Sequence, residues 1–117
     1  MMKLPLIDWE KCVELVSGNK DLAKNLLDLF FHHLPLSHND ITSAYDKKDF
    51  KRLSDQLHKL YGACCYCAVP TLTQAINQLS EAIKTKQDMM LEKLFQNLNQ
   101  EIEAVKREYG KWSEEVL

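Results

Sequence analysis

The sequence predicts an all-α fold, an up-down antiparallel four-helix bundle with a short extra helix at its N-terminal end. Apolar residues recur at spacings of three and four along most of the chain, and no segment shows the two-residue alternation of a β-strand. Glycine and proline number three each in 117 residues, too few for a loop-rich or all-β fold. The connections between the apolar segments are short, which favours antiparallel neighbours.

The first half of the chain predicts two helices. The first is expected from Asp8, its N-cap, to Val16, and the turn residues 17–19 should end it. The second is expected from Lys20 to about Asp46, with Pro35 inside it. An interior proline removes a backbone hydrogen bond and costs about 3 kcal/mol, so the segment is either one kinked helix or two helices. The apolar stripe continues past the proline without a turn cluster, which favours the kink.

The second half predicts three further helices. The third is expected to begin after the N-cap Asp49 and to end around residues 68–70, and Pro70 suits the first turn of the fourth. Residues 84–88 form the next predicted turn, with Asp88 as a candidate cap, and the last helix is expected to end near Gly110. The core stripe of the third helix comprises Phe50, Leu53, Leu57, Leu60, Cys64 and Cys67.

Length and composition restrict the classes of function. We expect residues 1–117 to form a single domain. The net charge of −2 argues against nucleic acid as a partner, because binding to a phosphate backbone needs a concentrated basic surface. No apolar run approaches the roughly 18 residues of a membrane span, and the N-terminal residues 1–5 lack a signal-peptide core. The four cysteines are therefore expected to be reduced thiols in the cytoplasm.

The third predicted helix presents one histidine, His58, to solvent. A helix turns by about 100° per residue, so His58 points well away from the core stripe that contains Leu57. Gly62 follows one turn later, about 40° from His58 on the same exposed strip. Glycine in mid-helix costs about 0.5–1 kcal/mol relative to alanine. Its missing side chain leaves room beside the imidazole for a phosphoryl group and for the face of a docking protein.

The stretch HKLYGA, residues 58–63, resembles the signature of histidine-containing phosphotransfer (HPt) domains. The longer run HKLYGACCYCAVP, residues 58–70, is similar to the C-terminal HPt domains of BarA-type hybrid sensor kinases. The resemblance also covers the short first helix and the proline in the second. It favours a piece of a larger hybrid kinase over a free-standing protein. The parent would then be anchored at the inner membrane, with this piece in the cytoplasm.

The resemblance implies a phosphorelay. His58 would accept a phosphoryl group from a receiver-domain aspartate and pass it to the aspartate of a response regulator. The domain would be a phosphocarrier that binds no ATP and holds no metal or cofactor, because the partner receiver supplies the Mg²⁺. The implied partners are the receiver domains of a hybrid kinase and of a response regulator, with no nucleic acid, no direct membrane contact and a monomeric state. A neutral imidazole has a free ring-nitrogen lone pair for the attack.

Several residues are expected around the phosphoryl group or at the docking face. They are Ser54, Asp55, Lys59, Tyr61, Gly62, Cys65 and Ser80. The family commonly has a lysine three residues after the histidine, and this chain has Tyr61, which brings no charge. The family also often has a glutamine where this chain has Ser80. Lys59 and Lys51 are candidates for a weaker and more distant positive potential.

Three hypotheses remain open from the sequence. The favoured one is the HPt phosphocarrier, and the second is a helical module that docks receivers without transfer, suggested by Tyr61. The third is a metal- or redox-responsive bundle that uses Cys64, Cys67 and the histidines 32, 33 and 38, which lack a chelating partner at i+4. Buried structural thiols are favoured over a metal site.

Two further expectations concern aromatic and basic residues. Phe30 and Phe31 are adjacent, so one of them should face away from the core and contribute to an apolar docking patch, while Trp9 and Trp112 should pack at the ends of the bundle. Lys47, Lys48, Lys51 and Arg52 form a basic cluster, either a solvated face or a surface that steers an acidic receiver.

Overall fold

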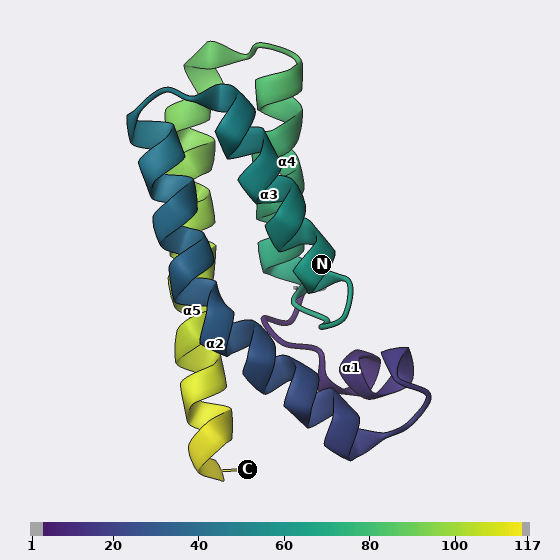
Figure 1. Ribbon diagram of the computed structural model, residues 1–117. Coiled ribbons are helices and arrows are strands. Elements are labelled where there is room, and N and C mark those ends of the chain that lie inside the picture. Colours follow the sequence, from purple (N-terminus) through teal and green to yellow (C-terminus); the bar gives the residue numbers. More distant parts are fainter. Residues whose placement is uncertain (1–3, 116–117) are drawn as a thin grey trace.

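The computed structural model describes residues 4–115 of the chain, with side chains through Trp112. Five helices make up this part, and it contains no strand. They are α1 (Trp9–Leu15), α2 (Lys20–Asp46), α3 (Phe50–Cys64), α4 (Pro70–Lys84) and α5 (Asp88–Glu115). Helices α2 to α5 alternate in direction and form the predicted up-down bundle, and α1 lies beside the N-terminal part of α2 (Figure 1). None of these helices combines the length and the apolar character needed to cross a membrane.

Short polar side chains begin the first three helices. The carboxylates of Asp8 and Asp49 accept the backbone N–H groups of Lys11 and Arg52, as predicted for N-caps, and Asn19 accepts that of Leu22. Pro70 is the first residue of α4, where its missing N–H is harmless.

Two lysines in the left-handed backbone conformation close the α2–α3 turn and the α4–α5 turn. Lys48 and Lys86 have φ values of 55° and 57°. The N–H groups that follow them, of Asp49 and Gln87, donate back to carbonyls in the last turns of α2 and α4 at 3.0 and 2.9 Å. These closures reverse the chain within three residues, so α3 starts directly beside the end of α2.

The predicted single, kinked second helix is confirmed. Pro35 lies inside α2, and the helix changes direction partway along its length (Figure 1). Leu34 and Ile41 on either side of the proline are both buried, so the apolar stripe continues through the bend. The bend lets the first half of α2 contact α1, while α2 as a whole packs against α3 and α5.

The third helix ends earlier than predicted. It stops at Cys64, and three i→i+3 hydrogen bonds tighten residues 65–67 into a turn. Pro70 restricts the backbone of the residue before it, so the chain leaves helical geometry before it reaches the proline. Cys67 is buried as predicted, but it points inward from this turn and not from the helix. Phe50, predicted in the core stripe, is exposed in the first turn of α3.

Two boundary predictions for the last helix were wrong. Asp88 is the first residue of α5 and not its cap, and its carboxylate still favours the positive end of the helix dipole. The helix also continues past Gly110 to Glu115. Trp112 holds these last turns, because its indole donates to Glu108 at 3.1 Å and packs edge-on against Trp9 with 6.0 Å between ring centroids. Both tryptophans pack against the core, as predicted, and their contact with each other was not predicted.

Phe30 and Phe31 are both buried, so the prediction that one of them faces away from the core was wrong. Helix α2 has neighbours on more than one side, and each ring finds an apolar partner. Phe31 stacks on Tyr109 of α5 with ring centroids 4.2 Å apart, and Phe30 packs edge-on against Phe31. The exposed apolar side chains of α2 are three leucines at seven-residue intervals, which share one face of the helix: Leu22, Leu29 and Leu36.

Candidate functional site

His58 is exposed on α3, and its neighbour Leu57 is completely buried. Leu53, Leu57 and Leu60 hold this side of the helix against the core. Burying a leucine contributes about 1.5–3 kcal/mol, so the three together fix the rotation of α3 about its axis. His58 is therefore held at the surface by its neighbours in sequence.

A groove of about 430 Å³ lies beside His58, and we call it the basic groove. It is lined by Asp49, Lys51, Arg52, Asp55, Gln56, His58 and Lys59. Apart from His58 itself, every lining residue except Lys59 precedes the histidine in the sequence. The groove therefore extends along α3 toward its N-terminal end. Helical side chains lean back over the preceding turn, which explains why the space at the imidazole opens on this side.

The predicted site residues fall into two groups. Asp55 and Lys59 share the basic groove with His58. The others do not line it: Tyr61, Gly62 and Cys65 are exposed farther along α3 and in the turn after it, and Ser54 and Ser80 are half-buried on α3 and α4.

Gly62 lies in helical geometry with free space around it. A Cβ atom built on Gly62 meets no other group within 4 Å. No neighbour in the described part of the domain therefore requires glycine at this position. The open space belongs to the surface one turn after His58, where an approaching molecule would find it.

A second groove, which we call the apolar groove, lies between α2 and α3. It measures about 160 Å³ and is lined by Leu26, Leu29, Phe30, His33, Leu34, Ser37, Leu60, Ala63, Tyr66 and Cys67. Leu29 and Tyr66 remain 53% and 67% exposed, so the apolar groove opens beside two large side chains that reach solvent. Sequence reasoning missed both residues, although the seven-residue spacing of leucines on α2 marks a face separate from the core stripe.

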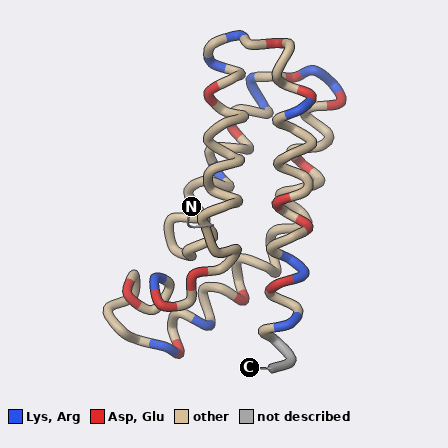
Figure 2. Tube along the Cα trace, turned by 180° about the vertical axis from the view of Figure 1, so that it is seen from behind, with Lys and Arg blue, Asp and Glu red and all other residues tan. Residues whose placement is uncertain are grey.

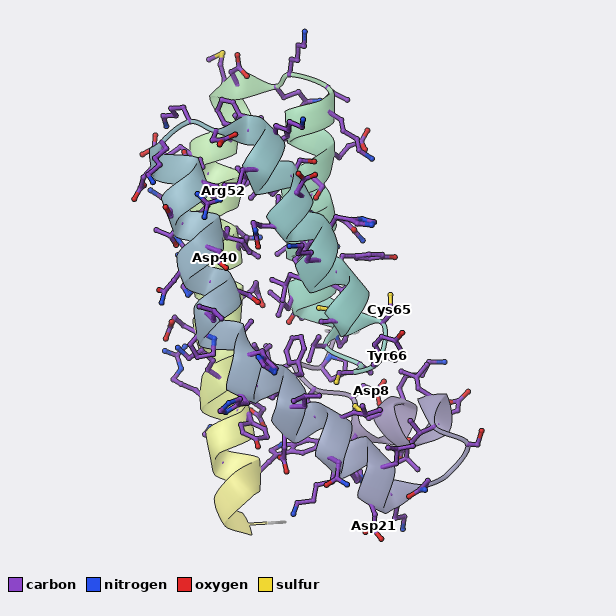
Figure 3. All side chains as sticks on the ribbon, viewed as in Figure 1. Asp8, Asp21, Asp40, Arg52, Cys65 and Tyr66 are labelled. Carbon is purple, nitrogen blue, oxygen red and sulfur yellow. The ribbon has the colours of Figure 1, made fainter. Side chains whose placement is uncertain are left out.

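The two grooves lie toward opposite ends of α3. Figure 3 shows Arg52 toward the end of α3 nearest the α2–α3 turn, and Cys65 and Tyr66 at the other end. In the view from behind, Lys and Arg gather with several acidic residues around the turns at that first end (Figure 2). The surface of α3 thus changes from charged to apolar along its length, with His58 between the two parts.

The buried cysteines connect three segments of the chain. The Cys67 thiol donates to the Leu26 carbonyl at 3.5 Å, and the Cys12 sulfur accepts the Ala68 N–H at 3.3 Å. Burial raises the pKa of Cys64 and of Cys67 to about 12 and also raises the pKa of Cys12, so all three stay protonated. Cys65 is the exposed one of the four.

The histidines other than His58 lie apart from the thiols. His38 pairs with Asn99 of α5 at 2.7 Å, and His32 and His33 pack edge-on against each other in solvent. Within residues 4–112, no group of three or more histidine, cysteine, aspartate or glutamate side chains could hold a metal ion.

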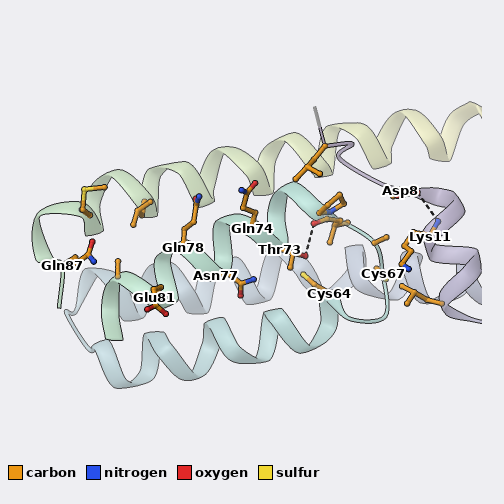
Figure 4. Close-up of a pocket in the computed structure, with 18 residues that line it drawn as sticks. Asp8, Lys11, Cys64, Cys67, Thr73, Gln74, Asn77, Gln78, Glu81 and Gln87 are labelled. Atoms are coloured by element: carbon orange, nitrogen blue, oxygen red, sulfur yellow. Dashed lines mark hydrogen bonds between the residues drawn. The ribbon is translucent and has the colours of Figure 1, made fainter. Parts of the chain in front are cut away.

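A third and larger cavity lies away from His58. It measures about 1020 Å³ and follows the outer face of α4, between α1 and the start of α5 (Figure 4). Its polar side chains include Gln74, Asn77 and Gln78, and it contains none of the residues predicted around the phosphoryl group or at the docking face.

Comparisons with known proteins identify the family. The profile described as Hpt domain matches residues 25–108. The chain is 27% identical over 107 residues to the signal transduction histidine-protein kinase BarA of Escherichia coli, covering 90% of the chain and 12% of that kinase. It is 31% identical over 87 residues to the sensor histidine kinase GacS of Pseudomonas protegens, covering 74% of the chain and 9% of that kinase. The chain thus spans about a tenth of the length of these curated relatives.

A solved structure shares the fold. The HPT domain from a sensor hybrid histidine kinase of Shewanella superimposes with a TM-score of 0.72 and is 25% identical in sequence. The match covers 96% of this chain and 97% of that one. The chain therefore belongs to the Hpt domain family, whose members serve histidine phosphotransfer in two-component phosphorelays.

Proposed function

We propose that His58 is the phosphoacceptor of this domain. The observation that carries the proposal is an exposed histidine between two grooves, on a helix whose register three buried leucines fix. The family match spans this segment and supports the same assignment. The donor is the aspartyl phosphate of a receiver domain, and the final acceptor is an aspartate of a response regulator.

The transfer step is a substitution at phosphorus. A ring nitrogen of neutral His58 attacks the phosphorus of the aspartyl phosphate, a P–N bond forms, the P–O bond breaks and the aspartate carboxylate leaves. Onward transfer reverses these roles. Positioning and charge neutralisation contribute most to phosphoryl transfer of this kind. The receiver brings the Mg²⁺, and the domain needs no ATP or metal of its own.

The apolar groove is the docking surface for the receiver. Leu29 and Tyr66 offer exposed apolar area beside a depression deep enough for one side chain. Such a pocket next to exposed aromatic and aliphatic groups suits an apolar side chain of a partner helix. Open space at Gly62 lets the partner backbone approach the imidazole closely.

The test is a transfer assay with phosphorylated receiver domains. The wild-type domain should take an acid-labile, base-stable label, and His58→Gln should abolish it. His32→Gln is the matched control, because His32 is also exposed but does not line either groove. Label that survives in His58→Gln would assign the phosphoryl group to another residue and contradict the proposal.

Tyr61 supports a second candidate function, a module that docks receivers without accepting phosphate. Tyr61 stands where the family commonly has a lysine, and it is exposed on the C-terminal side of His58. The same assay separates the two functions, because a docking module binds the receiver with measurable affinity and never takes the label.

A further inference from the structure

The basic groove contains more positive than negative charge. Lys51, Arg52 and Lys59 contribute three cations, against the carboxylates of Asp49 and Asp55. The Asp49 side chain accepts the Arg52 N–H as the N-cap of α3, so its charge already faces the positive end of the helix. Asp55 is the one carboxylate in the groove that stands within a turn of His58.

The cations of the groove are not engaged with Asp55. Among residues 4–112, the ion pairs are Lys11–Glu14 and Lys106–Glu103, and neither involves the groove. Lys51 and Lys59 stand one turn before and one turn after Asp55 on the same exposed strip. Their ammonium groups therefore remain available to an anion in the groove.

The lean of helical side chains brings His58 toward these charges. The Cα–Cβ bonds of a helix tilt toward its N-terminus, so the imidazole covers the turn around Asp55 and not the turn around Gly62. Lys59 leans over the same turn from the next position in the sequence. Lys51 lies about 10 Å along the axis from His58 and leans away from it in the same direction, so it acts on the phosphoryl group through the shared groove and not by direct contact.

We infer that the basic groove holds the phosphoryl group once His58 carries it. Lys51, Arg52 and Lys59 offset its charge, and Asp55 opposes it. The inference rests on the proposed function and adds the charge partners of the phosphoryl group. Tyr61 brings no cation to the C-terminal side of His58. The positive charge that a lysine would supply at position 61 comes from the basic groove instead.

The test uses the complete domain and phosphoramidate, a small donor that needs no receiver. His58 displaces ammonia from phosphorus, so a P–N bond to the imidazole forms and the P–N bond of the donor breaks. Phosphorus NMR gives the fraction of phosphohistidine at equilibrium for fixed donor and ammonia concentrations. Without a receiver, docking does not enter the measurement.

Charge variants of the groove should change this equilibrium in opposite directions. Lys51→Gln and Lys59→Gln should each lower the ratio of phosphorylated to free His58 by about threefold, and Asp55→Asn should raise it by about as much. Added salt should reduce all three effects, which a purely structural change would not show. Lys93→Gln is the control, because Lys93 is exposed on α5 and should leave the ratio unchanged.

Two outcomes overturn the inference alone. The first is a wild-type ratio in all the groove variants. The second is an unchanged ratio in the lysine variants with a fall in Tyr61→Phe, which would place the phosphoryl group on the C-terminal side of His58. Failure of the wild-type domain to take a phosphoryl group from phosphoramidate and from phosphorylated receivers alike would instead overturn the proposed function as well. These substitutions are at exposed positions, and thermal unfolding checks that each variant is folded.

Discussion

Helix α3 has two unlike surfaces on the two sides of His58. Toward its N-terminal end lies the basic groove, whose walls are lysine, arginine and aspartate side chains. Toward its C-terminal end lie Gly62 and the apolar groove, lined by residues of α2, α3 and the turn after α3. One surface is suited to an anion and the other to an apolar side chain of a partner.

The difference separates two tasks that a single surface would combine. Charged groups in solvent act over a distance and weaken with salt, whereas apolar contacts act at short range and are not screened by salt. Variants on the N-terminal side should therefore change the phosphorylated state, and variants on the C-terminal side should change docking. If the two surfaces are independent, a variant on one side of His58 leaves the property of the other side unchanged.

The largest expected effect concerns docking. Leu29→Asp should weaken binding of a receiver by about thirtyfold, because the charge removes an apolar contact and must be desolvated at the interface. Titration of a fluorescent receiver measures the dissociation constant. Leu22→Asp is the matched control, since Leu22 is exposed on the same face of α2 but outside the apolar groove.

Equal weakening by both substitutions would show that the docking surface follows the exposed leucines of α2 and is not confined to the apolar groove. The phosphohistidine ratio with phosphoramidate should be the same in Leu29→Asp as in the wild type. A change in that ratio would show that the two surfaces are coupled.

The next effect concerns the thiols beneath the apolar surface. The pKa of Cys64 and of Cys67 is raised from 9.0 to about 12, because burial disfavours the thiolate. The unfolded chain loses these protons near pH 9 while the folded chain keeps them, so stability falls as pH rises from about 9 to 12. Between pH 9 and 10 the free energy of unfolding should fall by about 2 kcal/mol from the two thiols together.

Urea unfolding at several pH values measures this loss. The double variant Cys64→Ala, Cys67→Ala should start from a lower stability at pH 7 and lose less of it as pH rises. Tyr109, whose pKa is also raised to about 12 by burial and by its hydrogen bond to Asp28, contributes above pH 10 in both proteins. The same pH dependence in both proteins would show that the thiols ionise freely in the folded chain.

The sequence predicts the helices well because each has its own amphipathic pattern. Asp8 and Asp49 are the caps expected of them, and the stripe through Leu53, Leu57 and Leu60 forms the core. The burial of both Phe30 and Phe31 could not be predicted in this way, because it depends on Tyr109, which is 78 residues away from Phe31 in the sequence. Periodicity describes one helix at a time and not its neighbours.

The site shows a similar limit. A helical wheel gives the angle of His58 about the axis and places Gly62 close to it. It carries no information on whether the free space lies before or after the histidine along the axis. That direction follows from the tilt of the Cα–Cβ bonds, and with it the basic groove is found on the N-terminal side. The apolar groove needs the contact between α2 and α3, which no single-helix pattern contains.

The smallest expected effects come from substitution of two glycines, and they separate stability from function. Gly62 in α3 and Gly110 in α5 both have space for a Cβ, with nothing within 4 Å of it. Alanine at either position should raise the free energy of unfolding by about 0.5–1 kcal/mol, because alanine favours the helix. Gly62→Ala alone should slow transfer from a receiver, since its methyl group occupies the space through which the partner approaches His58.

Urea unfolding and single-turnover transfer, measured on both variants, test this pair. Transfer in Gly110→Ala should match the wild type. A wild-type transfer rate in Gly62→Ala would show that the space beside the histidine is not used by the partner, and the division of α3 into a phosphate side and a docking side would then begin farther along the helix, at the apolar groove. Slower transfer with an unchanged phosphoramidate equilibrium would place the effect of Gly62 in docking and leave the basic groove as the place of the phosphoryl group.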